Sequence, residues 1–199
     1  MRGPGQMAAA MVLMMAAGLA AQYPQPLVET GDVTVDGQAV PYEIRHLPLS
    51  SFPELPAGIA AQLAARGCLI PQTYQARRPE NVVHGALERA GSSDWAVLCS
   101  SGGTVTLLVF FESAPETPTV LATALETERL QRRVSGNAMG FNWGIDPASP
   151  KRVHEAQTGL PRRPAPPDHD ALADSVVDRK TVYHFFARGK WTLVELPAE

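Results

Sequence analysis

The sequence has almost no excess of positive or negative charge. Its 17 Lys and Arg residues nearly balance its 20 Asp and Glu residues, so the formal net charge at pH 7 is −3. A nucleic-acid-binding protein needs an excess of basic residues on one surface, and so does a patch that holds a protein on anionic lipid. We therefore expect no nucleic-acid partner and no polybasic membrane contact, and the sequence does not identify any other partner.

Motifs of common enzymes are also missing. The chain has no Gly-x-Ser-x-Gly segment, and His154-Glu155 lacks the second histidine that would place two zinc ligands on one helical face. We expect no cofactor. The favoured function is a non-enzymatic binding or interaction module, and the alternative is a small metal-dependent enzyme or hydrolase.

Only two cysteines occur, Cys68 and Cys99. They are too far apart for dithiol chemistry of the Cys-x-x-Cys kind. An even number of cysteines in an oxidising compartment favours pairing, so we predict a structural Cys68–Cys99 disulfide. Two buried free thiols are the alternative.

The longest uncharged apolar run lies at the amino terminus. Arg2 precedes residues 7–19, which are all Ala, Met, Val, Leu or Gly, and small residues cluster at 18–21. A secretory signal peptide has this pattern, whereas a transmembrane helix needs about 20 apolar residues. No cysteine near the cleavage point can accept a lipid. We predict a signal peptide over residues 1–21 and a periplasmic or secreted protein without a stable membrane anchor. A buried apolar helix is the alternative.

The remaining chain, residues 22–199, is long enough for one domain with a hydrophobic core. The apolar patterns predict an α+β fold, with an antiparallel sheet of about five to eight strands, one main helix and one shorter helix. A proline-rich surface connector is expected at 158–168. A hairpin that turns at Asp36-Gly37 is expected at 33–40, an antiparallel meander at 81–87, 95–100 and 104–111 with 95–100 as its inner strand, and a closing hairpin at 181–186 and 190–196. Further strands are expected at 42–47 and 119–125, and helices at 56–66 and at 150–157, the second with Ser149 as its N-cap.

The most polar group of residues follows the connector. Asp168, His169 and Asp170 are consecutive, and Asp174 lies just beyond them. Carboxylates two residues apart in a loop can bind Ca²⁺, and the histidine suits a transition metal. The spacing of an EF-hand is missing, however, and an aspartate here can instead cap the following segment. The sequence leaves a metal site and a capping role open, and we favour the cap.

Aromatic residues mostly fall within apolar runs, which indicates packing in the core. Trp143 differs because glycines bracket it in the stretch Gly140-Phe-Asn-Trp-Gly144. An exposed tryptophan beside Asn142 would suit ligand recognition on a loop. We treat Trp143 and Asn142 as candidate ligand-binding residues, with core packing as the alternative.

Several short strings resemble a group of uncharacterised exported bacterial proteins. The likeness covers roughly residues 60–196 and implies export and a compact fold, but it carries no assigned activity and no catalytic residue. The strings are the GCLIPQ segment at 67–72, Asn-Val-Val at 81–83, the DWAVLCS segment at 94–100, His-Asp at 169–170, Tyr-His-Phe-Phe at 183–186 and Gly-Lys-Trp at 189–191.

The signal peptide makes a prediction about mass. The intact mass of protein secreted by a producing cell should correspond to a chain that begins at Ala21 or Gln22, because signal peptidase cuts after small residues. A cytoplasmic protein that still carries Met1 would contradict it.

Overall fold

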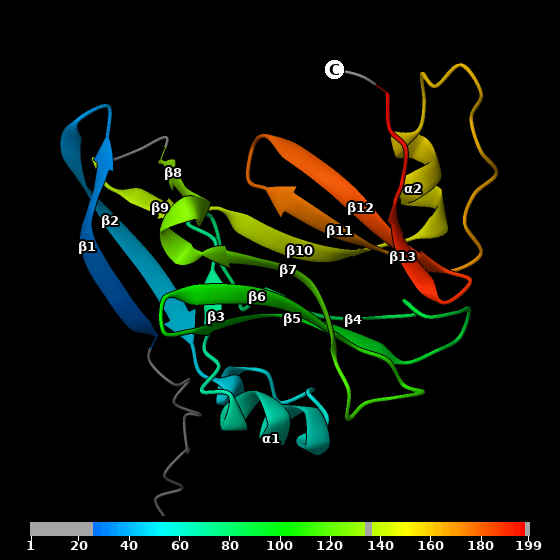
Figure 1. The fold of residues 1–199 in the computed structure, drawn as a ribbon, viewed down its shortest axis with the longest axis horizontal. Coiled ribbons are helices and arrows are strands. Elements are labelled where there is room, and N and C mark those ends of the chain that lie inside the picture. The colour runs from blue at the N-terminus through cyan, green and yellow to red at the C-terminus, as the bar shows by residue number, and fades with distance from the viewer. Residues whose placement is uncertain (1–25, 134–136, 198–199) are drawn as a thin grey trace, which may run out of the picture.

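The computed structural model describes residues 26–133 and 137–197, where the chain forms thirteen strands in three sheets (Figure 1). Sheet A contains β1 (Leu27–Val35), β2 (Gln38–Leu47), β3 (Ile70–Gln72), β8 (Leu130–Arg132) and β9 (Met139–Phe141). Sheet B contains β4 (Val82–Gly85), β5 (Asp94–Ser101), β6 (Thr104–Phe110) and β7 (Thr119–Leu125). Sheet C contains β10 (Trp143–Ala148), β11 (Ala171–Val176), β12 (Lys180–Ala187) and β13 (Lys190–Leu193). The predicted signal peptide lies outside the described residues.

The described residues also form two α-helices, α1 (Ala57–Ala65) and α2 (Pro150–Ala156), and the short 3-10 helices η1 (Leu49–Ser51) and η2 (Glu126–Arg129). One longer and one shorter helix were expected, and both are present. The expectation of a single antiparallel sheet of five to eight strands is wrong, because the strands divide into one sheet of five and two of four. The β2–β9 pair is parallel, so sheet A is mixed.

The missed strands explain this difference. We expected a loop around Gly140, but the glycine lies in β9, where a Cβ would come 2.5 Å from the Cβ of Tyr74. Glycine is needed there for close packing against a side chain rather than for a turn. The acidic residues before and within β11 also hid that strand, because Ala171, Leu172 and Ala173 are its buried part.

The hairpin turns agree with the sequence. Asp36 and Gly37 connect β1 to β2 with φ angles of 51° and 79°, and Arg188 and Gly189 connect β12 to β13 with φ angles of 52° and 75°. Two consecutive residues with positive φ are the mark of the type I′ turn, which suits the twist of a two-residue hairpin. The predicted meander of 81–111 is also confirmed as β4, β5 and β6.

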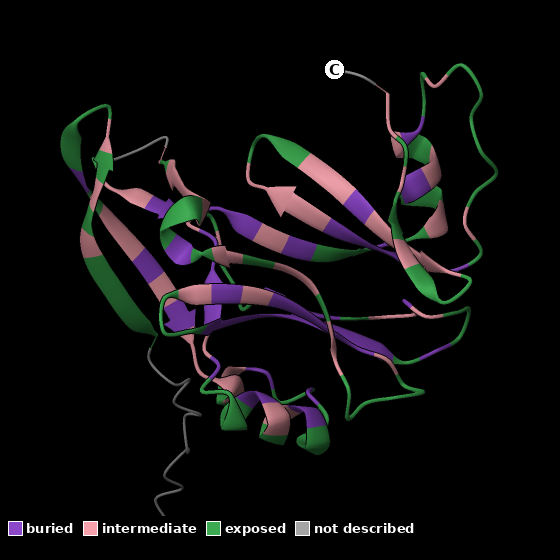
Figure 2. Cartoon of the chain, in the orientation of Figure 1, coloured by how far each residue is buried: buried purple, intermediate pink, exposed green. Residues whose placement is uncertain are grey.

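Strand β5 is buried over nearly its whole length, as Figure 2 shows. It lies between β4 and β6, as its apolar sequence predicts for an inner strand. One buried cluster joins all three sheets, because it includes Ile44 of β2, Leu98 of β5, Trp143 of β10 and Leu172 of β11. The three sheets therefore share a hydrophobic core.

Both helices begin and end close to the predicted residues. Pro56 precedes α1, and Gly67 follows it with a φ of 68°. Ile59 and Leu63 are buried, and they pack in the cluster that contains the apolar side chains of β5 and β6. In α2, the Ser149 side chain accepts a hydrogen bond from the backbone N–H of Arg152, which is the predicted N-cap.

The predicted disulfide is present between Cys68 and Cys99, with a Cα–Cα distance of 5.1 Å. The bond attaches Cys68, which lies just after α1, to Cys99 of the buried strand β5. Beside it, Leu69 and Ser100 exchange two backbone hydrogen bonds of 2.9 and 2.8 Å. No helix among the described residues is long and apolar enough to cross a membrane.

Loss of this disulfide should lower the free energy of unfolding. The bridge closes a loop of 31 residues, which on the chain-entropy model contributes about 3.5 to 4 kcal/mol. We expect the Cys68→Ala/Cys99→Ala double variant to denature at a lower urea concentration than the natural protein, and reducing agent should affect only the natural protein. Equal denaturation midpoints would contradict the prediction.

Candidate metal-binding site

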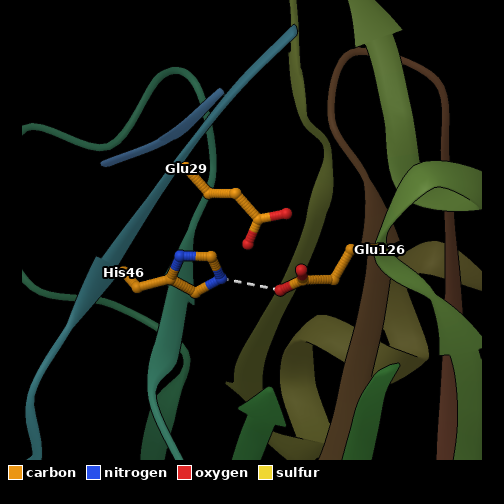
Figure 3. A group of neighbouring side chains, drawn as sticks. All are labelled: Glu29, His46 and Glu126. Atoms are coloured by element: carbon orange, nitrogen blue, oxygen red, sulfur yellow. Dashed lines mark hydrogen bonds and ion pairs between the residues drawn. The ribbon is translucent and has the colours of Figure 1, made fainter. Parts of the chain in front are cut away.

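Three ionisable side chains from separate parts of the chain meet at the junction of sheets A and B (Figure 3). They are Glu29 of β1, His46 of β2 and Glu126, which opens η2 directly after β7. Each offers one nitrogen or oxygen atom, and these three atoms lie within 4.8 Å of one another. In Figure 3 the Glu29 carboxylate points toward the space beside the His46 and Glu126 side chains.

The register of the β1–β2 hairpin places two of these groups on one face. Leu27 pairs with His46, and Glu29 pairs with Ile44. Because side chains alternate along a strand, Glu29 and His46 point to the same side of sheet A. Ile44, which is opposite Glu29 and two residues from His46, points to the same side and is fully buried, so this side faces the core.

Glu126 is placed by the end of strand β7. Its backbone N–H donates to the carbonyl of Gly103, which lies in the tight turn between β5 and β6. The Glu128 side chain accepts a hydrogen bond of 3.2 Å from the N–H of Leu125, which stabilises the first turn of η2. The chain thus turns sharply at Glu126, and its side chain is directed into the interior.

His46 and Glu126 form a buried pair. The His46 Nε2 and Glu126 Oε1 atoms are 2.6 Å apart, and each side chain is only 3% exposed. Ser100 of β5 also donates its hydroxyl hydrogen to Glu126 Oε1, at 2.5 Å. Burial alone would raise the pKa of the Glu126 carboxyl, but the hydrogen bonds from His46 and Ser100 and the charge of His46 outweigh it, so the pKa is lowered.

Two polar atoms of this pair have no partner among the described residues. They are Nδ1 of His46 and Oε2 of Glu126, and both are buried. A buried carboxylate oxygen without a donor is unfavourable, because it has lost water and gained no hydrogen bond in exchange. The unpaired Glu126 oxygen is therefore the feature of this group that the fold itself does not explain.

Glu29 is held over the buried pair by Tyr42. The Tyr42 hydroxyl donates to Glu29 Oε1 at 3.3 Å, and partial burial and the Glu29 charge raise the pKa of the Tyr42 phenol. The ring lies across Gly31, its partner on β1, where a Cβ would come 2.8 Å from two ring carbons and from the hydroxyl oxygen. Gly31 is thus required for the position of Tyr42, and Tyr42 for that of Glu29.

The arrangement suits metal binding better than covalent catalysis. A nucleophilic serine needs an imidazole within hydrogen-bonding distance, whereas Ser100 donates to the carboxylate of Glu126. One imidazole nitrogen and two carboxylates are ligands of Zn²⁺ and related ions. In such sites a hydroxyl that bonds a ligand carboxylate orients it, which is the role open to Ser100.

The structure does not gather the four residues that the sequence singled out around the connector. Asp168 Oδ1 pairs with His169 Nδ1 at 2.6 Å, and His169 Nε2 lies 2.9 Å from the carbonyl of Phe186. The His169 hydrogen bond lowers the pKa of the Asp168 carboxyl. Asp170 instead accepts a hydrogen bond of 3.1 Å from the N–H of Ala86.

Asp174, expected in the same loop, lies within β11. Its two carboxylate oxygens bond Trp143 Nε1 at 2.7 Å and His184 Nε2 at 3.2 Å. Asp168 and His169 therefore pair with each other, whereas Asp170 and Asp174 have separate partners, and no common ligand group forms around the four in the described parts of the chain. A metal site on these residues stays a prediction without support from their geometry. Asp170 caps the backbone at Ala86 rather than the segment that follows it.

The expectation of an exposed Trp143 is wrong. Its side chain is fully buried in the core shared by the three sheets, and Asn142 is 6% exposed. The Arg129 guanidinium also covers the Trp143 ring, 4.0 Å from its centre. The glycines on either side suggested a loop, but the tryptophan opens strand β10. A ligand-binding role for Trp143 and Asn142 depended on exposed side chains, and both side chains are buried.

Comparison with known proteins gives no further guidance. The chain matches no protein-family model, and neither the curated proteins nor the solved structures contain a significant match. The resemblance to exported bacterial proteins stays a prediction. No motif in the sequence joins Glu29, His46 and Glu126, because they lie in three distant segments that only the folded sheets bring together.

The buried Ser100–Glu126 hydrogen bond should contribute measurably to stability. Ser100→Ala removes the hydrogen bond that the Ser100 hydroxyl donates to the buried Glu126 carboxylate. We expect the free energy of unfolding to fall by about 1.5 to 3 kcal/mol. Ser113→Ala is the matched control, because Ser113 makes the same kind of bond to Glu88 on the surface. It should cost less than about 0.5 kcal/mol. Equal losses in urea denaturation would contradict a special role for Ser100.

Proposed function

We propose that this protein is a metal-binding protein of the periplasm or the extracellular space, and that it holds a divalent transition-metal ion between Glu29, His46 and Glu126. The observation that carries the proposal is the buried, unpaired Oε2 atom of Glu126 beside the Glu29 carboxylate. A bound cation would satisfy this oxygen and offset the repulsion between two neighbouring carboxylates.

The ligand types select the class of ion. Ca²⁺ and Mg²⁺ prefer six or more oxygen ligands, whereas an imidazole nitrogen with two carboxylates favours Zn²⁺ or a similar borderline ion. Zinc lies about 2.0 to 2.2 Å from such ligands, so two ligand atoms of one ion are at most about 4 Å apart. The three candidate atoms lie within 4.8 Å of one another, and Glu29, which is exposed on the edge strand β1, has the side chain that can adjust to complete the set.

Binding also requires a change within the buried pair. His46 coordinates through Nε2 only when that atom carries no proton, so an ion displaces the hydrogen shared with Glu126. Ser100 keeps its bond to the carboxylate and holds Glu126 in place while His46 turns to the ion. Such a site combines two buried ligands, of which Glu126 is held by Ser100, with one adaptable ligand from the surface.

Location and a non-enzymatic role belong to the proposal as well. The Cys68–Cys99 disulfide is compatible with an oxidising compartment, and the amino-terminal sequence pattern supports export. Binding rather than catalysis is supported by Ser100, whose hydroxyl is engaged by a carboxylate and not by an imidazole. The metal-dependent enzyme stays the alternative.

Titration calorimetry of the metal-free full-length protein with Zn²⁺ tests the proposal. We expect one ion per chain, and at a free ion concentration 100 times the dissociation constant a gain in stability of about 2.7 kcal/mol. Glu29→Gln should weaken binding at least tenfold without unfolding the protein, because Glu29 is exposed. Ca²⁺ should bind far more weakly than Zn²⁺.

Asp32→Asn is the matched control, since Asp32 is exposed on the same strand but points to the opposite face. His84→Ala controls for binding by surface histidines. These two variants should bind Zn²⁺ like the natural protein. The proposal fails if Zn²⁺ does not bind, or if Glu29→Gln and Asp32→Asn have the same affinity.

A further inference from the structure

The opposite face of sheet A carries three arginines around one small pocket. Arg45 flanks His46 on β2 and therefore points away from the metal-binding site. Arg77 and Arg78 follow β3 in the segment 73–81 and line the same pocket of about 230 Å³. Leu47 and Pro79 supply apolar parts of its wall, and none of the described residues that line it is acidic.

Arg45 is fixed in place by the backbone of that segment. Its Nη2 donates to the carbonyls of Thr73 and Ala76 at 3.2 and 2.8 Å. The guanidinium has five N–H donors in a planar fork, so these two bonds leave others directed elsewhere. Arg45 therefore both supports the segment that carries Arg77 and Arg78 and presents a fixed positive charge to the pocket.

Glu80 is the acidic residue nearest to Arg77 and Arg78 in the sequence, but its carboxylate does not pair with either of them. Glu80 Oε1 accepts a hydrogen bond of 2.8 Å from the N–H of Thr73. Among the described residues, none of the three guanidinium groups forms an ion pair with a carboxylate. Arg77 and Arg78 also border a wider hollow that contains Asp146 and Asp178, but they do not pair with them either.

A pocket with an apolar wall and three arginines that form no ion pair among the described residues favours an anionic ligand. Guanidinium groups bind phosphate and carboxylate through paired hydrogen bonds, and neighbouring positive charges are stabilised when an anion neutralises them. The volume is slightly below that of ordinary drug-sized sites, so the ligand is small. We infer that this pocket binds a small organic oxyanion, a phosphate, sulfate or carboxylate group on a compact apolar body, independently of the metal.

Phenyl phosphate is a suitable probe, because it combines a dianionic group with one apolar ring. In titration calorimetry we expect binding that weakens as NaCl is raised from 50 to 500 mM. Inorganic phosphate, without the ring, and benzyl alcohol, without the charge, should each bind at least tenfold more weakly. Benzoate in place of phenyl phosphate distinguishes a carboxylate from a phosphate ligand, and saturable binding of either supports the inference.

The double variant Arg77→Gln/Arg78→Gln should bind the probe at least tenfold more weakly, since it removes two charge-assisted contacts. Both residues are exposed, so the fold should be retained. Arg162→Gln/Arg179→Gln is the control with the same change in charge at exposed positions elsewhere. The inference is overturned if neither phenyl phosphate nor benzoate binds, if benzyl alcohol binds as tightly, or if both double variants lose affinity equally.

Discussion

The structure depends on one shared hydrophobic core. Each of the three sheets is small, with four or five strands, and a sheet must bury its apolar face against another element. Leu98 of β5, Trp143 of β10 and Ile44 of β2 belong to the same buried cluster, so each sheet covers the others. The disulfide then fastens α1 to the strand at the centre of sheet B. Burial of β5 is the constraint that sets the rest of the arrangement.

That constraint also produces the candidate site. Ser100 lies at the end of β5, next to the disulfide, and His46 lies on the core side of sheet A. Where the two sheets meet, Glu126 enters between them and is deprived of water by both. A polar group at this junction is unfavourable unless it is fully paired, and Oε2 of Glu126 has no partner in the described ranges 26–133 and 137–197. The same packing that stabilises the fold thus leaves a charged group that a cation would satisfy.

Local features were predictable from the sequence. The Asp36-Gly37 turn, the Ser149 N-cap and the inner strand at 95–100 each follow from a few adjacent residues, and all three are confirmed. The division into three sheets was not, because Gly140 indicated a loop where a close side-chain contact required glycine. The site was missed for a related reason. Glu29, His46 and Glu126 come together only through strand pairing and burial, which the sequence does not show. Asp168, His169 and Asp170 were singled out only because they are adjacent in the sequence.

The proposed function depends on a metal ion bound between the core and the edge strand of sheet A. The most direct test is a crystal structure of the protein grown with Zn²⁺ and measured at the zinc absorption edge, where anomalous scattering locates the ion. We expect a single strong peak within bonding distance of His46 Nε2, a Glu126 oxygen and Glu29. A peak only beside His169, or no peak near Glu126, would contradict it.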